Sequence, residues 1–263
     1  MPLLRLAITQ IDIAIGNREL NFEKIERMLQ TSWTRSDIPT AVVLPEMWDV
    51  GYVIKESQKY GDRDASMAAE FLRVIAVKYN CWFTGGSVLA LTENGAVNRA
   101  MVVDPSGKYV ASYDKTHLIP LMDEGKYLWP GDRRTHFDLS GIPAALAICY
   151  DLRFPELTRL YAAEGAELQF FSAEWPISRI DHWCTLLKAR AIENMMFVAA
   201  CNCVGKVNGT TFGGHSTVVD PWGKILYEGG IEEDFAFVEI DTSQVKKARD
   251  FLRVFEMRRP ELY

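Results

Sequence analysis

The sequence lacks the features that mark secreted and membrane proteins. No apolar stretch approaches the roughly 20 residues that a helix needs to cross a bilayer. The first ten residues, MPLLRLAITQ, contain no basic segment followed by an apolar segment and a small-residue cleavage site. We therefore expect a soluble, cytoplasmic protein without a membrane partner.

An excess of basic residues is also missing. The 263 residues include 29 Lys and Arg against 35 Asp and Glu, which gives a formal net charge of −6. A nucleic-acid partner requires a basic face that neutralises phosphate charge. The charge therefore argues against nucleic acid as a partner, and solubility is sufficient to explain the mild acidity.

Cysteines, histidines and nucleotide-binding sequences are sparse. Five scattered cysteines, an odd number, do not form a secreted disulfide framework, so we expect free thiols in a reducing compartment. Four histidines without a close pair of ligands predict no metal site. Neither Gly-x-Gly-x-x-Gly nor a Walker sequence is present, and no cofactor is predicted.

What the sequence does contain is a regular succession of β-rich and amphipathic stretches, without a low-complexity linker, which is typical of α/β architecture. The predicted strands are Leu3–Thr9, Ala41–Leu44, Trp82–Leu89, Val97–Val103, Tyr109–Tyr113, Ala144–Ile148, Leu168–Ser172, Phe197–Cys203, Ser216–Val219 and Phe235–Ile240. The predicted helices are Asn21–Thr31, Ser66–Tyr79, Pro155–Glu164 and Ile180–Asn194.

One short segment occurs twice. Residues 102–108 are Val-Val-Asp-Pro-Ser-Gly-Lys, and residues 218–224 are Val-Val-Asp-Pro-Trp-Gly-Lys. Each copy predicts a strand, a tight Asp-Pro-x-Gly turn and a second strand, and such hairpins disfavour a purely parallel sheet. We therefore predict two comparable halves that form a four-layer α-β-β-α sandwich of two mixed sheets, in one domain that spans residues 1–263.

Three reactive side chains come directly after predicted strands. Glu46 follows Ala-Val-Val-Leu-Pro, Lys115 follows Val-Ala-Ser-Tyr-Asp, and Cys149 follows Ala-Ala-Leu-Ala-Ile. Ligand sites in α/β sheets lie at the carboxyl ends of strands, so the three side chains are predicted to converge. Taken singly, each has an ordinary structural explanation, namely a strand-end ion pair, a solvated lysine and an inert buried cysteine.

The segment after Cys149 strengthens the functional interpretation. Tyr150-Asp-Leu-Arg-Phe-Pro leads into a predicted helix, with Pro155 suited to its first turn. A sharp strand-to-helix turn exposes a nucleophile and directs backbone N–H groups at the substrate. The helix dipole is expected to favour the thiolate form of the cysteine.

These segments resemble the three signature segments of the nitrilase, or carbon–nitrogen hydrolase, superfamily. They occur in the order Leu-Pro-Glu-Met-Trp, Tyr-Asp-Lys-Thr-His-Leu and Ile-Cys-Tyr-Asp-Leu-Arg-Phe-Pro-Glu. The similarity extends along the chain, through residues 189–194 and 214–216 to the final Arg-Arg-Pro-Glu-Leu-Tyr. Within the superfamily the chain looks most similar to the ω-amidase (2-oxoglutaramate amidase)-like branch.

The resemblance implies a role for each residue. Cys149 would be the nucleophile, Glu46 the general base and Lys115 the cation that stabilises the oxyanion, together with the backbone N–H of Tyr150. Glu124 matches a second glutamate of the family, which would position the lysine and the substrate amide. The reaction implied is hydrolysis of a small carboxamide, such as the ω-amide of 2-oxoglutaramate, through a thioester by a homodimer that needs no cofactor.

Substrate-binding residues are predicted near the same strand ends. Tyr52, Glu174 and Trp175 are candidates for shaping the pocket, and Arg179 is a candidate for binding a substrate carboxylate. Arg153 is a second cationic candidate, although an internal ion pair with Asp151 or Glu156 explains it better.

Several alternatives stay open. The substrate can be another small amide, such as deaminated glutathione or an N-carbamoyl compound, and the protein can be a catalytically silent scaffold. A thiol redox protein using Cys201 and Cys203 lacks the Cys-x-x-Cys arrangement. Arg190 and Glu193 are spaced to pair across a helical turn, and His215 is interpreted as a satisfied core histidine.

Overall fold

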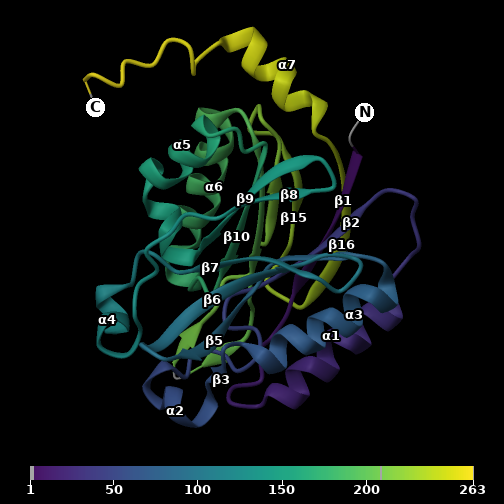
Figure 1. Cartoon of the computed structure of the whole chain (residues 1–263), viewed down its shortest axis with the longest axis vertical. Coiled ribbons are helices and arrows are strands. Elements are labelled where there is room, and N and C mark those ends of the chain that lie inside the picture. The colour runs from purple at the N-terminus through teal and green to yellow at the C-terminus, as the bar shows by residue number, and fades with distance from the viewer. Residues whose placement is uncertain (1–2, 208, 263) are drawn as a thin grey trace.

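Two mixed β-sheets lie at the centre of the molecule, and helices cover their outer faces (Figure 1). The structure is a computed structural model and describes residues 3–207 and 209–262. Helices α1 (Arg18–Ser32) and α3 (Ser66–Tyr79) cover the first sheet, and α5 (Pro155–Ala163) and α6 (Ile180–Asn194) cover the second. The predicted four-layer α-β-β-α sandwich is thereby confirmed.

The first sheet has the strand order β16-β1-β2-β4-β6-β5-β3, and β7 also pairs with β6. Its strands are β1 (Leu3–Gln10), β2 (Thr40–Leu44), β3 (Asp62–Arg63), β4 (Trp82–Gly85), β5 (Ser87–Thr92), β6 (Gly95–Val103), β7 (Tyr109–Asp114) and β16 (Asp234–Asp241). The pairs β1–β2 and β2–β4 are parallel, whereas β1–β16 and β6–β7 are antiparallel.

The second sheet has the order β15-β14-β11-β10-β9-β8. Its strands are β8 (His136–Leu139), β9 (Ile142–Ile148), β10 (Leu168–Ala173), β11 (Phe197–Asn202), β14 (Thr217–Val219) and β15 (Ile225–Glu228). The central strands β9, β10 and β11 run parallel, which brings their carboxyl ends to one edge. A small separate hairpin joins β12 (Lys206–Val207) to β13 (Thr210–Thr211).

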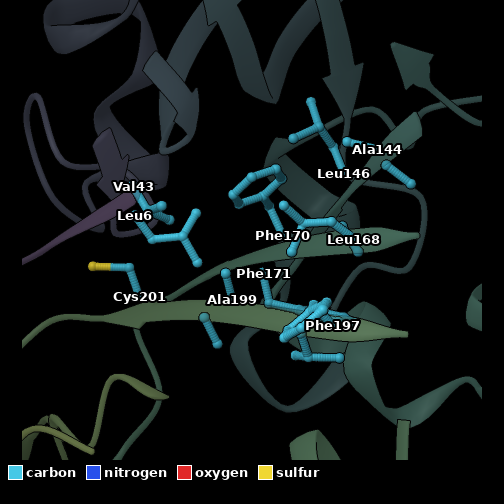
Figure 2. Close-up of a cluster of buried hydrophobic side chains, with 14 of the residues drawn as sticks. Leu6, Val43, Ala144, Leu146, Leu168, Phe170, Phe171, Phe197, Ala199 and Cys201 are labelled. Carbon is cyan, nitrogen blue, oxygen red and sulfur yellow. The ribbon is translucent and has the colours of Figure 1, made fainter. Parts of the chain in front are cut away.

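The core lies between the sheets and is filled from both of them. Figure 2 shows Leu6 and Val43, from β1 and β2, among side chains of the second sheet that include Phe170 and Cys201. All four residues are fully buried. Because every central strand is covered on both faces, its sequence is almost continuously apolar rather than alternating.

The long helices form where the residues to be buried recur every three or four positions and therefore lie on one face of the helix. Helix α1 buries Asn21, Ile25 and Leu29, which are four residues apart, and the side chain of Asn17 caps its first turn by accepting the Leu20 N–H. Sequence patterns did not predict β8 or α7 (Ser243–Leu252), and they predicted β15 only as the second strand of the hairpin after residues 218–224. Helix α7 buries Val245 and Ala248, and most of its other residues are polar or charged.

The predicted strand Trp82–Leu89 is wrong as a single element, because it divides into β4 and β5 at Gly85 and Gly86. Both glycines have a positive φ, of 66° and 71°, and the pairing with β6 shifts by one residue across them. A Cβ on Gly86 would lie 2.6 Å from Cβ of Leu44. The break is therefore a glycine bulge that lets the backbone pass close to β2.

The repeated Asp-Pro-x-Gly segments form matching turns, one in each sheet. The N–H of Asp104 donates to the carbonyl of Lys108 at 2.9 Å, and the N–H of Asp220 donates to the carbonyl of Lys224 at the same distance. In each turn the aspartate carboxylate also accepts the backbone N–H of the lysine. The predicted hairpin is therefore present in both sheets, as β6–β7 and as β14–β15.

None of the helices within residues 3–207 and 209–262 combines the length and the apolar character that crossing a membrane requires.

We predict that Gly86→Ala destabilises the fold much more than Gly141→Ala. Both positions have a positive φ, so both substitutions strain the backbone by about 1–2 kcal/mol. Only at Gly86 does the new Cβ clash, whereas nothing lies within 4 Å of it at Gly141, so Gly86→Ala should cost roughly 1–3 kcal/mol more. Denaturant unfolding of the two variants measures the difference. Equal losses would show that the close approach of Gly86 to β2 does not matter.

Candidate active site

The three predicted catalytic side chains come from strand ends of both sheets. Glu46 follows β2, Lys115 follows β7 and Cys149 follows β9. Glu46 and Lys115 are each 1% exposed, and Cys149 is 2% exposed. The site is therefore assembled between the two sheets and is shielded from bulk water.

A buried ammonium group links two carboxylates. Nζ of Lys115 lies 2.9 Å from Oε1 of Glu46 and 2.7 Å from Oε1 of Glu124. Burial, the largest influence, lowers the pKa of Lys115, yet the neighbouring acidic groups, Glu46 first among them, together raise it above its ordinary value. The lysine is therefore a fixed cation, and the predicted grouping of Glu46, Lys115 and Glu124 is present.

Glu46 is held in place through both carboxylate oxygens. Nδ2 of Asn98 donates to Oε1 at 2.7 Å, and the backbone N–H of Glu174 donates to Oε2 at 2.9 Å. The carbonyl of Asn98 also accepts the backbone N–H of Lys115 at 2.9 Å. Asn98 therefore positions both Glu46 and Lys115, and sequence reasoning missed it because it lies within a strand rather than at a strand end.

Glu124 is the first residue of the short helix α4 (Glu124–Tyr127). The hydroxyl of Tyr52 donates to its Oε1 at 2.5 Å, and the backbone N–H of Ile119 donates to its Oε2 at 2.5 Å. Tyr52, predicted to line the pocket, is half-buried beside this acid. Its phenol therefore helps to hold the Glu124 carboxylate in contact with Lys115.

Cys149 occupies a sharp turn directly after β9. Its φ is +47°, in the left-handed region that a side chain rarely adopts, and it begins the 3₁₀ segment η3 (Cys149–Arg153). Such strain is characteristic of nucleophile turns, because it directs the side chain away from the strand and into the site.

Asp151 fixes this turn and was also missed. Its carboxylate accepts the backbone N–H of Ile148 at 2.9 Å, the hydroxyl of Tyr113 at 2.7 Å and the backbone N–H of His117 at 3.0 Å. Tyr113 and His117 flank Lys115 in the sequence, so one buried acid connects the cysteine turn to the lysine segment. The only available signal was that Asp151 belongs to the third signature segment.

The expectation that the helix dipole favours a thiolate is wrong. Burial raises the pKa of the Cys149 thiol well above its usual range, Glu46 raises it further, and Lys115 lowers it only in part. The α-helix that follows, α5, begins only at Pro155, too far away to compensate for burial. At rest, Cys149 is therefore a neutral thiol.

Glu174 and Trp175 follow β10 and line the same region. The carboxyl oxygens of Glu174 are buried, and neither has a hydrogen-bond partner among the described residues. Burial raises the pKa of Glu174 well above its usual value, and Glu46 adds to the effect. These surroundings therefore favour the protonated form of Glu174, and Trp175 is 3% exposed next to it.

The two candidate arginines differ in their surroundings. The guanidinium of Arg153 lies 4.7 Å from the ring of Trp175 and 6.0 Å from the ring of Tyr150. The expected ion pair of Arg153 with Asp151 or Glu156 is wrong, since none forms within the described part of the chain. Arg179 is exposed, and its backbone carbonyl accepts the indole N–H of Trp175 at 2.8 Å.

Other side chains singled out from the sequence lie outside this group. Arg190 and Glu193 form the predicted pair at 2.9 Å. The interpretation of His215 as a core residue is wrong, because its side chain is 31% exposed. All five cysteines are free thiols, and all but the partly exposed Cys184 are buried. The thiol of Cys201 donates to the carbonyl of Thr9.

Several known proteins are similar to this chain in sequence and in architecture. A family model described as Carbon-nitrogen hydrolase matches residues 5–250. A 2-oxoglutaramate amidase from Bacillus subtilis is 39% identical over 258 residues, 98% of both chains, and Omega-amidase NIT2 from Homo sapiens is 29% identical over 272 residues, 100% of this chain and 98% of the relative. The structure of XC1258 from Xanthomonas campestris, a CN-hydrolase superfamily protein, superposes with a TM-score of 0.91 at 30% identity, with 98% of both chains covered.

The chain belongs to the carbon–nitrogen hydrolase family, and it is an enzyme of the nitrilase superfamily. The superfamily membership expected from the three signature segments is thereby confirmed.

We predict that Cys149 contributes no thiolate at neutral pH. Its raised pKa means that the proton leaves only above the ordinary cysteine value of about 8.5, so the thiolate signal should appear only in more alkaline solution. The difference in ultraviolet thiolate absorbance between the wild type and Cys149→Ser measures this titration. A plateau already reached at about pH 7 would contradict the assignment.

Proposed function

We propose that this enzyme hydrolyses the terminal amide of a 2-oxo acid, such as 2-oxoglutaramate, to the corresponding acid and ammonia. The observation that carries the proposal is the buried Lys115 ammonium between Glu46 and Glu124, next to the strained Cys149 turn. The names of the similar amidases described above support the substrate class.

The first half of the reaction forms a thioester. Sulfur of Cys149 attacks the amide carbonyl as Glu46 accepts the thiol proton, because the resting thiol is neutral. The carbonyl oxygen becomes an oxyanion, which Lys115 and the backbone N–H of Tyr150 stabilise. A single donor of this kind is typically worth about 3–4 kcal/mol in the barrier.

Ammonia leaves as the thioester forms, which completes the first half, and the acid leaves in the second half. Protonated Glu46 gives its proton to the amide nitrogen, the carbon–nitrogen bond breaks and ammonia leaves. A water molecule then loses a proton to Glu46 and attacks the thioester carbonyl. The carbon–sulfur bond breaks, the acid departs and Cys149 regains its proton. Glu124 keeps Lys115 oriented throughout and accepts a hydrogen bond from the substrate amide. No cofactor takes part in these steps.

Substrate selection follows from the groups around Trp175. Arg153, stacked over that ring and without a carboxylate partner in the described residues, binds the substrate carboxylate in this proposal. Arg179 was the stronger candidate from sequence, but its exposed side chain supports the role less well. The neutral Glu174 donates its unused proton to a substrate oxygen, and Tyr52 and Trp175 shape the pocket.

Ammonia release from a panel of amides tests the proposed function. We expect turnover of 2-oxoglutaramate to exceed that of succinamate, an N-carbamoyl compound, deaminated glutathione and simple nitriles. Cys149→Ala should lower kcat by at least about a thousandfold without loss of fold, and Lys115→Met should lower it by roughly 10²–10³-fold. Preference for another member of the panel would reject the substrate, and an active Cys149→Ala variant would reject the mechanism. No turnover at all would favour a silent scaffold.

We predict that Arg153→Met lowers kcat/KM for 2-oxoglutaramate by about 10–100-fold, mainly through KM, because a charge-assisted hydrogen bond to the carboxylate is lost. Turnover of a neutral amide of similar size should change little. Arg179→Met is the matched control, because it removes an equal charge from the exposed neighbouring segment. A larger effect of Arg179→Met would reverse the two roles.

The assembly and compartment are part of the proposal. A homodimer is supported by apolar side chains on the C-terminal segment, where Phe251 is 76% exposed and Met257 is 77% exposed. In Figure 1 this yellow segment leads away from the sheets after α7. A cytoplasmic location and a single domain over residues 1–263 complete the proposal, and a free catalytic thiol suits a reducing compartment.

A further inference from the structure

Three potential metal ligands gather outside the catalytic site. Cys184 lies on α6, His215 precedes β14 and Glu228 ends β15. Their ligand atoms all lie within 4.8 Å of one another. Nδ1 of His215 is 2.8 Å from Oε1 of Glu228, and Sγ of Cys184 is 3.8 Å from the same oxygen.

The backbone around these residues is fixed by other contacts. Trp183, fully buried beside Cys184, donates its indole N–H to the carbonyl of His215 at 2.8 Å. Oγ1 of Thr217 donates to the same carbonyl at 2.7 Å, and Thr217 pairs with Glu228 across the β14–β15 hairpin. One hydrogen-bonded unit therefore carries all three donor side chains.

We propose that Cys184, His215 and Glu228 bind one Zn²⁺ ion. A thiolate, an imidazole and a carboxylate form a donor set that suits zinc, whereas Mg²⁺ and Ca²⁺ prefer oxygen ligands alone. Water completes the tetrahedron, because three protein ligands leave one position open. The site takes no part in the amide hydrolysis described above and does not depend on it.

The distances fit with small adjustments. Tetrahedral zinc with these ligands places donor atoms about 3.3–3.6 Å apart. The histidine–glutamate contact must therefore open and the cysteine must approach, each by movements on the order of 1 Å that side-chain rotations supply. The side chains of His215 and Glu228 are 31% and 37% exposed, so an ion can reach them from solvent.

Binding requires Cys184 to lose its proton. In the free protein, burial raises the pKa of the Cys184 thiol to about 11, and Glu228 adds to the effect. The sulfur–zinc bond forms as the thiol proton passes to solvent, so the bound cysteine is a thiolate. The thiolate and the Glu228 carboxylate together balance the two charges of the ion.

Sequence spacing did not predict this site. It predicted no metal site, because the four histidines came without a close pair of ligands. The three ligands come from separate segments, at 184, 215 and 228, and only the packing of α6 against the second sheet brings them together.

Metal titration of the full-length chain tests the proposal. After treatment with a chelator, the protein is titrated with Co²⁺ to detect the thiolate–cobalt charge-transfer band, and Zn²⁺ is counted by equilibrium dialysis. We expect one Zn²⁺ per chain, and at least tenfold weaker binding in Cys184→Ser, His215→Asn and Glu228→Gln.

Two controls separate this site from other metal binding. Cys149→Ser removes the catalytic thiol and should leave the cobalt band intact. His136→Asn disrupts another exposed histidine–glutamate pair, with Glu164 at 2.6 Å, and should not change zinc binding. Loss of the band in Cys149→Ser, or binding unaffected by Cys184→Ser, would overturn the proposal, as would absence of binding to the wild type.

A further test uses only the wild type, so misfolding of a variant cannot affect its result. Zn²⁺ should protect Cys184 from alkylation, measured by mass spectrometry of its peptide, in proportion to occupancy. Unchanged alkylation of Cys184 at saturating Zn²⁺ would also reject the site. Because hydrolysis is not measured, this result is independent of whether the proposed substrate is right.

Discussion

The buried ammonium of Lys115 is the interaction on which the site depends. Moving ions out of water costs several kcal/mol each unless their hydrogen bonds are replaced. Here every carboxylate oxygen of Glu46 and Glu124 has a donor. Lys115 reaches one oxygen of each acid, which also accepts from Asn98 or Tyr52, and a backbone N–H group donates to each of the other two oxygens. The polar cluster therefore persists in a dry region between two sheets, where its charges are weakly screened and act strongly on a reacting carbonyl.

The same environment determines the state of the nucleophile. A thiol that is surrounded by apolar strands and faces Glu46 retains its proton. The nucleophile is therefore unreactive until Glu46 accepts that proton. Glu46 completes that activation only when a substrate carbonyl is present to accept the sulfur. An unreactive resting thiol also resists oxidation, since thiolate character governs that chemistry.

Much of this arrangement was predictable from sequence, because strand-end positions and short-range patterns determine it. The locations of Glu46, Lys115 and Cys149 followed from the apolar runs before them, and the repeated Asp-Pro-x-Gly turns predicted matching hairpins. Asn98 and Asp151 were not predicted as positioning residues, because Glu46, Tyr113 and His117, which they contact, lie far away in the sequence and no local pattern reveals these contacts. The contact of the Arg153 guanidinium with the ring of Trp175 was likewise not predictable, because it depends on how the two segments pack.

The contacts of Asp151 have a consequence for how the protein can change over time. This carboxylate joins the turn of Cys149 to Tyr113 and His117, on either side of Lys115, and so the nucleophile and the cation share one anchor. A displacement of either segment is transmitted to the other. The two therefore cannot drift independently, whereas the loops around Tyr52 and Trp175, which this anchor does not hold, can vary more freely.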